Sequence, residues 1–191
     1  MLMADLIARP PGEYLDADDI VESTAPEVMA LAARLGAGRG DDRAFARAAF
    51  DWVRDEIAHA GDAGDPRFAV SATEVLADGV GWCYAKAHLL TAVLRAGGVP
   101  TGLCYQRLAD DGTDGGYVVH GLVAVHLDGG WHRQDPRGNK PGVAAEFSLG
   151  EERLAWPVDP ALGEVDHRGV HVAPAPGVIA ALRRGELATE L

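Results

Sequence analysis

The sequence predicts an α+β fold in which helices come first and an antiparallel sheet follows them. Up to about residue 100, apolar residues recur at the spacing of amphipathic helices. Beyond that point, short runs rich in β-branched and aromatic residues alternate with glycine-rich turns, a pattern typical of strands and hairpins. Helices that precede the strands, instead of alternating with them, favour an antiparallel sheet.

Two helices are predicted after an irregular lead-in over residues 1–22, where Pro10, Pro11 and Gly12 interrupt any regular structure. The first helix starts near Pro26 and ends at Leu35, because Gly36 and Gly38 follow it. The second covers residues 41–60, with aspartates at its start and an apolar face at helical spacing. A loop from residue 61 to residue 66 follows.

The most informative stretch is residues 71–95, which predicts a short capped helix, a turn and a long apolar helix. Ser71 and Glu74 form a capping box, and Gly79 ends the helix that they start. From Cys83 the apolar positions recur at helical spacing until the glycines and proline of residues 97–100. Cys83 is therefore expected at a helix N-terminus.

Three strands are predicted after this helix, over residues 101–108, 117–127 and 131–135. The middle strand is apolar on both faces and is therefore expected inside the sheet. The sequence Asp-Gly-Gly at residues 128–130 predicts a hairpin turn. A further short strand over residues 144–147 and a helix over residues 178–184 complete the expected elements.

Composition limits the classes of protein that fit. A chain of 191 residues with nearly half of them apolar suits a single globular domain over residues 1–191. The net charge of -12 argues against nucleic acid or an anionic membrane as a partner. We see no signal peptide and no membrane span, and two cysteines cannot build a disulfide framework. These features predict a cytoplasmic protein with free thiols.

Cys83, His120 and Asp135 are the residues with the clearest chemical potential. A helix N-terminus favours an anion, so Cys83 is expected to ionise more readily than an ordinary cysteine. A cysteine nucleophile also needs a general base, and that base needs a third group to orient it. His120 in the central strand and Asp135 at the end of the next strand are candidates for these two roles.

The same region resembles the transglutaminase-like superfamily. The resemblance rests on the runs GVGWCYAKAHLLTAVLRAGGVPTGLCYQ, HGLVAVHL and WHRQDPRGN, which agree with the family in order and spacing. It covers about residues 43–140 and leaves residues 150–191 as a proline-rich C-terminal extension. The resemblance implies a papain-like fold with a Cys83–His120–Asp135 catalytic triad. Leu122 and Arg137 depart from the family, which often has tryptophan and threonine there, so the substrate preference is open.

By this resemblance, the expected activity is cysteine-dependent hydrolysis of an amide or peptide bond through a thioester acyl-enzyme. Two alternatives remain, namely acyl transfer to an amine and a catalytically silent binding module. Trp82, Tyr105 and Gln106 are the predicted substrate contacts. The backbone N–H of Cys83 is expected in the oxyanion hole. The sequence leaves its side-chain donor open, with His59 and Gln106 as two candidates.

Neither a cofactor nor a metal is expected, and the predicted partner is a peptide or another amide-containing substrate. His120, His126 and His132 are regularly spaced, but His120 and His126 would lie about 20 Å apart along one strand. The loop at residues 109–116 is a candidate gate for the cleft, since it immediately precedes the strand of His120.

One geometric problem accompanies the triad. A two-residue turn at residues 129–130 would pair Asp135 with Ala124, four residues from His120 and about 13 Å away. A shifted turn, a bulge or strong twist is therefore required if Asp135 is to reach His120.

Overall fold

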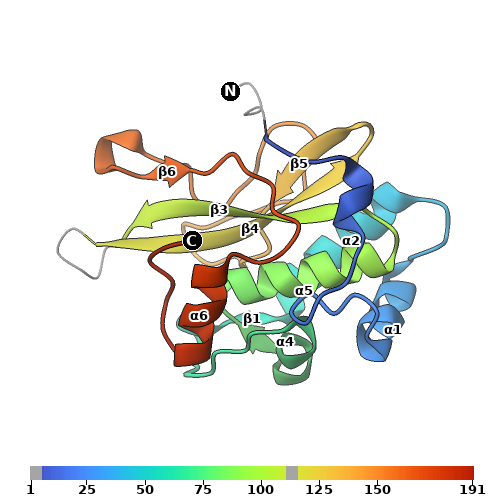
Figure 1. The fold of residues 1–191 in the computed structure, drawn as a ribbon, viewed down its shortest axis with the longest axis horizontal. Coiled ribbons are helices and arrows are strands. Elements are labelled where there is room, and N and C mark those ends of the chain that lie inside the picture. Colours follow the sequence, from blue (N-terminus) through green and yellow to red (C-terminus); the bar gives the residue numbers. More distant parts are fainter. Residues whose placement is uncertain (1–5, 111–115) are drawn as a thin grey trace.

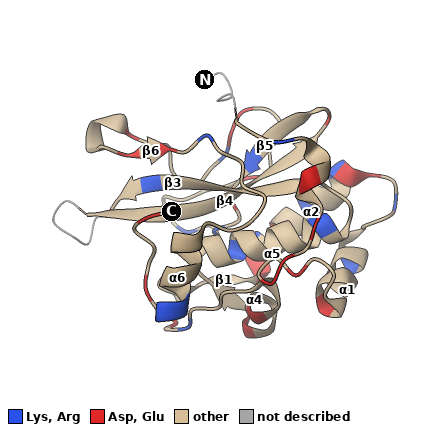
Figure 2. Ribbon diagram, viewed as in Figure 1, with Lys and Arg blue, Asp and Glu red and all other residues tan. Residues whose placement is uncertain are grey.

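The computed structural model describes residues 6–110 and 116–191, and it has the α+β architecture that the sequence predicts. A sheet packs across one side of helix α5, and other helices cover the other side of that helix (Figure 1). Five of the candidate gate's residues, 111–115, lie outside the described residues. Acidic and basic residues are interspersed along the ribbon (Figure 2).

The helices fall into a long, mostly N-terminal set and a few short turns. The longer helices are α1 (Pro26–Leu35), α2 (Asp42–Glu56), α4 (Ala72–Asp78), α5 (Cys83–Ala96) and α6 (Pro176–Arg184). The short ones are α3 (Ala60–Ala63) and the 3-10 turns η1 (Pro11–Tyr14) and η2 (Pro160–Leu162).

The main sheet has the order β5-β4-β3-β6, with neighbouring strands antiparallel. Its strands are β3 (Thr101–Ala109), β4 (Tyr117–Leu127), β5 (Gly130–Gln134) and β6 (Val165–Asp166). As predicted, β4 lies inside the sheet. A second, parallel pair joins β1 (Ala58–His59) to β2 (Val80–Gly81), and it sets His59 opposite Gly81, two residues before Cys83.

The predicted helix ends are confirmed where local capping determines them. Ser71 and Glu74 form the reciprocal capping box of α4, and Gly79 ends that helix in the left-handed conformation. The side chain of Asp41 accepts a hydrogen bond from the backbone N–H of Ala44 at the start of α2. Each of these signals lies within a few residues of the helix end that it fixes.

The prediction of a helix over residues 41–60 is wrong at its C-terminal end, because α2 stops at Glu56. Residues 58 and 59 leave the helix to pair with β2. The buried ammonium group of Lys86 donates to the backbone carbonyls of Arg54, at 3.1 Å, and Ile57. Lys86 thus satisfies carbonyls that the helix end leaves free, and it ties this end to α5.

The short strand predicted at residues 144–147 is also absent from the described structure. Side-chain amides satisfy backbone groups within this segment and just after it. The amide of Asn139 bonds to both the N–H and the carbonyl of Ala145, and the amide of Gln134 bonds to both groups of Ser148. Because these bonds replace a β-ladder, the segment runs as an irregular loop.

The hairpin between β4 and β5 resolves the geometric problem of Asp135. Leu127 pairs with Gly130, so the turn residues are Asp128 and Gly129, both at positive φ. This register differs from the expected one by a single turn position. It places Gln134 opposite Val123 and brings the following residue, Asp135, two residues closer to His120 along β4.

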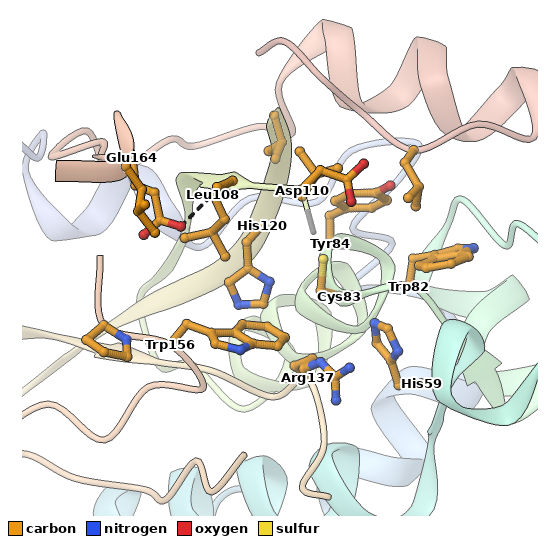
Figure 3. A pocket seen from close by; sticks show the side chains of 16 residues that line it. His59, Trp82, Cys83, Tyr84, Leu108, Asp110, His120, Arg137, Trp156 and Glu164 are labelled. Atoms are coloured by element: carbon orange, nitrogen blue, oxygen red, sulfur yellow. Dashed lines mark hydrogen bonds between the residues drawn. The ribbon is translucent and has the colours of Figure 1, made fainter. Parts of the chain in front are cut away.

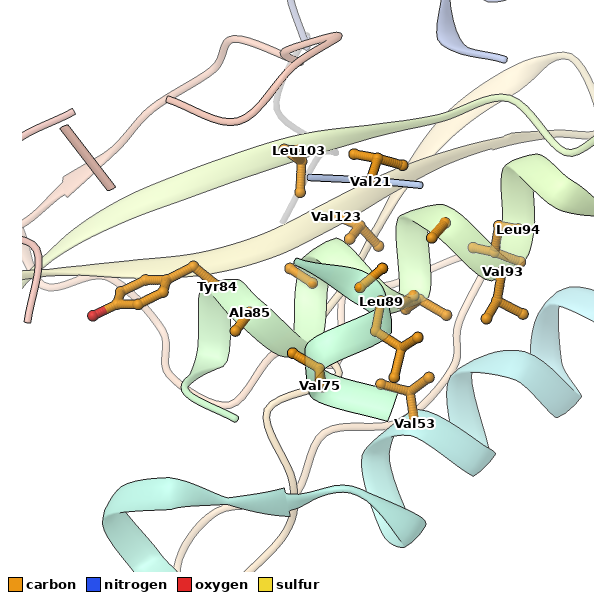
Figure 4. Close-up of a cluster of buried hydrophobic side chains, with 14 of the residues drawn as sticks. Val21, Val53, Val75, Tyr84, Ala85, Leu89, Val93, Leu94, Leu103 and Val123 are labelled. Carbon is orange, nitrogen blue, oxygen red and sulfur yellow. The ribbon is translucent and has the colours of Figure 1, made fainter. Parts of the chain in front are cut away.

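The core lies on both faces of the sheet. The larger cluster joins α5 to β3, β4 and the other helices, and it includes Leu89, Val93, Leu103 and Val123 (Figure 4). A smaller cluster on the opposite face holds Cys104, Leu122 and Ala124 under the N-terminal segment around Tyr14. Side chains of one strand therefore alternate between the two clusters.

Gly121 in β4 permits the close approach of α5 to the sheet. A Cβ atom at this position would lie 2.5 Å from the Cα of Tyr84, which is backbone and cannot rotate away. We therefore expect Gly121→Ala to lower the free energy of unfolding by about 1–3 kcal/mol or more, as overpacked cores do. Urea denaturation would measure this loss. Gly12→Ala is the control, because no atom lies within 4 Å of its added Cβ; equal stability of the two variants would contradict the packing argument.

Candidate active site

Cys83 is the first residue of α5, and the residues before it hold it there. Trp82 is extended, and β2 immediately precedes it. The backbone N–H of Lys86 makes a 2.9 Å hydrogen bond to the carbonyl of Trp82, so the N–H groups of residues 83–85 have no acceptor within the helix. The helix N-terminus therefore presents N–H donors and a partial positive charge beside the thiol.

His120 reaches Cys83 from the edge of β4. Because β5 ends opposite Val123, it leaves the first half of β4 unpaired on that side. Along this edge, the N–H of Gly121 donates to Cys83 Sγ at 3.4 Å, and the N–H of Val119 donates to the carbonyl of Ala188 at 2.8 Å. The ring of His120 lies beside the thiol on this edge (Figure 3).

Asp135 fixes the orientation of the His120 ring. Its Oδ2 atom accepts a hydrogen bond from Nε2 of His120 at 2.8 Å. The same carboxylate accepts backbone N–H bonds from Ala155 at 3.0 Å and Arg137 at 3.2 Å, and it is completely buried. With Nε2 held by the carboxylate, Nδ1 is the ring nitrogen left for Cys83.

Burial and charge act in opposite directions on these three groups. Burial alone would raise the pKa of Cys83, but the charges and hydrogen bonds of His120 and His59 outweigh it and lower that pKa to about 6. Burial would lower the pKa of His120, but the charges of Asp135 and Cys83 raise it. Burial would raise the pKa of Asp135, but the charge of His120 and three hydrogen bonds lower it. Together these shifts favour a thiolate–imidazolium pair at neutral pH.

Cys83 and His120 line a cleft of about 340 Å³. Its apolar lining includes Leu108, Val118, Leu162 and Leu187. Trp156 also lines it, with its ring perpendicular to that of His120 at a centroid distance of 5.1 Å (Figure 3). A cleft of this volume and lining suits a small ligand or a short stretch of peptide.

The structure brings Cys83, His120 and Asp135 together. Of the three predicted substrate contacts, it places only Trp82 in the cleft. Tyr105 lies in the larger core cluster, where its hydroxyl accepts the N–H of Ala175 at 2.9 Å. Gln106 follows it on the opposite face and lines a separate hollow with Arg133 and Trp156. Neither Tyr105 nor Gln106 therefore lines the Cys83 cleft, because alternation along β3 directs them to opposite faces of the sheet.

Leu122 and Arg137, the two departures from the family pattern, lie in different parts of the structure. Leu122 is buried in the smaller cluster, away from the cleft. Arg137 lines the cleft, makes a bidentate ion pair with Asp62, and lies over Trp156 at 4.9 Å from the ring centroid. Asp62 comes from α3, so Arg137 joins the loop after β5 to the segment that carries His59.

Sequence reasoning missed Trp156 and Asp62 as neighbours of the site. Trp156 did leave a signal, since it is the only large aromatic residue in the proline-rich segment from residue 150 on. Asp62 left none, because its place depends on a charge partner 75 residues away.

Metal and membrane features can be stated for the described residues only. Residues 6–110 and 116–191 contain no group of three or more histidine, cysteine or acidic side chains placed to hold a metal ion. His126 packs edge-on against Trp131, and His132 bonds to the carbonyl of Leu127, so neither joins His120. Within the same residues, none of the helices combines the length and the apolar character needed to cross a bilayer.

Comparison with known proteins agrees with the family resemblance and the fold. The family model described as the transglutaminase-like superfamily matches residues 29–136. A putative cysteine protease from Cytophaga hutchinsonii has a similar structure, with a TM-score of 0.52 and 20% identity over 65% of this chain. The periplasmic domain of TgpA from Pseudomonas aeruginosa follows at a TM-score of 0.46 and 20% identity over 67% of this chain.

The likeness to the Cytophaga hutchinsonii structure shows the fold alone, because the sequence identity is low. This chain covers 40% of the first of those structures and 48% of the second. No curated protein matches the sequence.

Proposed function

Because this chain belongs to the transglutaminase-like superfamily, we propose that it is a cysteine-dependent hydrolase that cleaves an amide or peptide bond. Cys83 is the nucleophile, His120 the general acid and base, and Asp135 the residue that orients His120. The arrangement that carries the proposal is the buried thiol between a helix N-terminus and a histidine whose far nitrogen is held by Asp135.

In the first half-reaction, the Cys83 thiolate attacks the carbonyl carbon of the substrate and forms a carbon–sulfur bond. The carbonyl oxygen becomes an oxyanion, which accepts a hydrogen bond from the backbone N–H of Cys83. The tetrahedral intermediate then collapses, and the carbon–nitrogen bond breaks. His120 gives its proton to the leaving amine, and a thioester to Cys83 remains.

In the second half-reaction, His120 is neutral and acts as a base. It removes a proton from water as the water attacks the thioester, and the carbon–sulfur bond then breaks to release a carboxylic acid. The thiolate and the imidazolium are restored. Asp135 stays ionised throughout and stabilises the imidazolium whenever it forms. An amine that replaced water in this step would give acyl transfer with the same residues.

Acylation of Cys83 by p-nitrophenyl acetate would test this proposal. We expect a burst of p-nitrophenolate, an increase in protein mass by one acetyl group on Cys83, and loss of that group in water. Cys104 is an internal control, because burial raises its pKa to about 12 and keeps it unreactive.

The fate of the acetyl group separates the alternatives. Loss in buffer alone supports hydrolysis, whereas an acetyl group that persists until a primary amine is added would favour acyl transfer. A protein that is not acetylated at Cys83 would contradict both activities and favour a silent binding module. A screen of peptide anilides would then identify the amide substrate of an active protein.

A further inference from the structure

A second histidine–carboxylate pair lies on the other side of Cys83. His59 lines the same cleft, and its ring stands opposite that of His120 across the thiol (Figure 3). Its Nδ1 atom is 3.7 Å from Oδ2 of Asp62. This Nδ1 atom is buried and has no hydrogen-bond partner among the described residues. The ring therefore sits between a carboxylate and a thiol.

We propose that His59 is the side-chain donor of the oxyanion hole, and that Asp62, held by Arg137 and Lys140, is the positioning residue for it. This inference rests on the proposed function and adds a catalytic residue to it. In the imidazolium form of His59, Nδ1–H points to Asp62 and leaves Nε2–H for the carbonyl oxygen of the substrate.

Three sets of contacts fix His59 beside the thiol. The β1–β2 pairing sets His59 opposite Gly81, two residues before Cys83. Lys86, one turn into α5, holds the carbonyl of Ile57. The backbone at Gly61 packs against the rings of His59 and Trp82, so tightly that a Cβ there would lie 2.9 Å from Trp82. A donor held this rigidly does not need to reorganise when the oxyanion forms.

The charges around Asp62 explain why it can orient His59 without being neutralised. Arg137 binds the carboxylate through two N–H groups, and Lys140 binds Oδ1 at 2.8 Å. Burial opposes ionisation of this carboxyl, but these hydrogen bonds and the charges of Arg137 and His59 lower its pKa well below the usual range. Asp62 therefore stays an anion and can accept the Nδ1–H of His59. This gives Arg137, which departs from the family pattern, a structural purpose.

The other candidate donors fit less well. Gln106 lines a different hollow. The indole nitrogen of Trp82 is buried without a partner among the described residues, but it points away from Cys83 (Figure 3). The Trp82 ring is held in that orientation by stacking on Phe68 at a centroid distance of 5.4 Å.

The chemistry of two reagents separates an oxyanion donor from a residue that only tunes the thiol. Iodoacetamide reacts with a thiolate at a saturated carbon: the carbon–sulfur bond forms as iodide leaves, and no oxyanion develops. p-Nitrophenyl acetate reacts at a carbonyl: the sulfur adds to carbon, the oxygen becomes an oxyanion, and nitrophenolate then leaves. The ratio of the acylation rate to the alkylation rate therefore reports oxyanion stabilisation.

We expect His59→Phe to lower this ratio by at least about tenfold, since loss of one oxyanion donor costs about 10²–10³-fold in amide hydrolysis and less with an activated ester. His59→Gln retains an N–H donor and should recover most of the ratio. His126→Phe is the matched control, because His126 lies six residues from His120 and packs on Trp131; it should change neither rate.

Asp62→Asn provides a second route if His59→Phe fails to fold, because Asp62 is partly exposed and Asn keeps its size and one acceptor oxygen. It should also lower the ratio. The inference is overturned if both rates fall by the same factor in His59→Phe, or if the ratio in Asp62→Asn equals that of the wild type. A wild-type Cys83 that reacts slowly with both reagents would refute the proposed function itself, which is a different result.

Discussion

Replacement of either Cys83 or His120 by alanine is expected to reduce turnover to the uncatalysed background. Without Cys83 no thioester forms, and without His120 the thiol loses its base and the leaving amine its acid. Loss of a nucleophile or its base costs about 10⁶-fold in a serine hydrolase triad. Because the two residues act as one unit, the double variant should be no worse than either single variant.

Steady-state hydrolysis of p-nitrophenyl acetate would measure these losses, with circular dichroism to confirm folding. Cys104→Ala is the control, because Cys104 is buried in the smaller core cluster on the far face of the sheet. It should retain turnover. If the losses of the two single variants multiplied in the double variant, Cys83 and His120 would not act as one unit. Substantial activity in Cys83→Ala would show that Cys83 is not the nucleophile.

Replacement of Asp135 by alanine is expected to have the second largest effect. Asp135 is completely buried and pairs with His120, so its loss leaves an unpaired buried charge. Breaking such a pair typically costs about 3–5 kcal/mol of unfolding free energy. Asp135→Asn should cost less, because an amide oxygen can still accept the N–H of His120. Urea denaturation would measure both.

The pH dependence of this cost distinguishes the ion pair from simple packing. The pKa of Asp135 is lowered on folding, so its stabilisation is present above the unfolded value of about 3.9 and is lost as the pH falls. The pKa of His120 is raised, so its stabilisation is present below about pH 6.5 and is lost as the pH rises through the folded value. The stability difference between wild type and Asp135→Asn should therefore be largest between about pH 4 and pH 6.5.

Asp128→Asn is the control for the ion pair, since Asp128 is half exposed and pairs with the exposed side chain of Arg43. A surface pair of this kind contributes about 0–1 kcal/mol. If the stability curves of wild type and Asp135→Asn ran parallel at every pH, the buried ion pair would not contribute as described.

The fold was predictable where short-range signals determine it. Ser71, Glu74 and Gly79 fix both ends of α4 within eight residues, and the start of α5 at Cys83 follows directly. The pair β1–β2 was not predictable, because two-residue strands carry no periodicity and exist only through their tertiary contact. For the hairpin, the sequence offered two turn positions one residue apart, and Asp128-Gly129 fits because both residues adopt positive φ.

Some residues of the candidate site could be predicted from the sequence, and others could not. Cys83, His120 and Asp135 stand at the ends or edges of regular elements, so their order along the chain could place them. Trp156, Asp62 and Arg137 come from loops, and long-range contacts alone bring them to the cleft. Tyr105 was predicted to contact the substrate because its strand was expected beside the helix of Cys83, but the alternation of β3 directs it into the core.

The rate of iodoacetamide labelling of Cys83 against pH, in the wild type and in His120→Ala, tests the central claim most directly. If His120 holds Cys83 as a thiolate, the wild-type rate should rise with a midpoint near the Cys83 pKa of about 6. In His120→Ala, the midpoint should move up toward about 8.5, the pKa of an ordinary cysteine, or higher. A midpoint near that ordinary value in both proteins would show that Cys83 is not activated, and the account of this site as a cysteine hydrolase would be wrong.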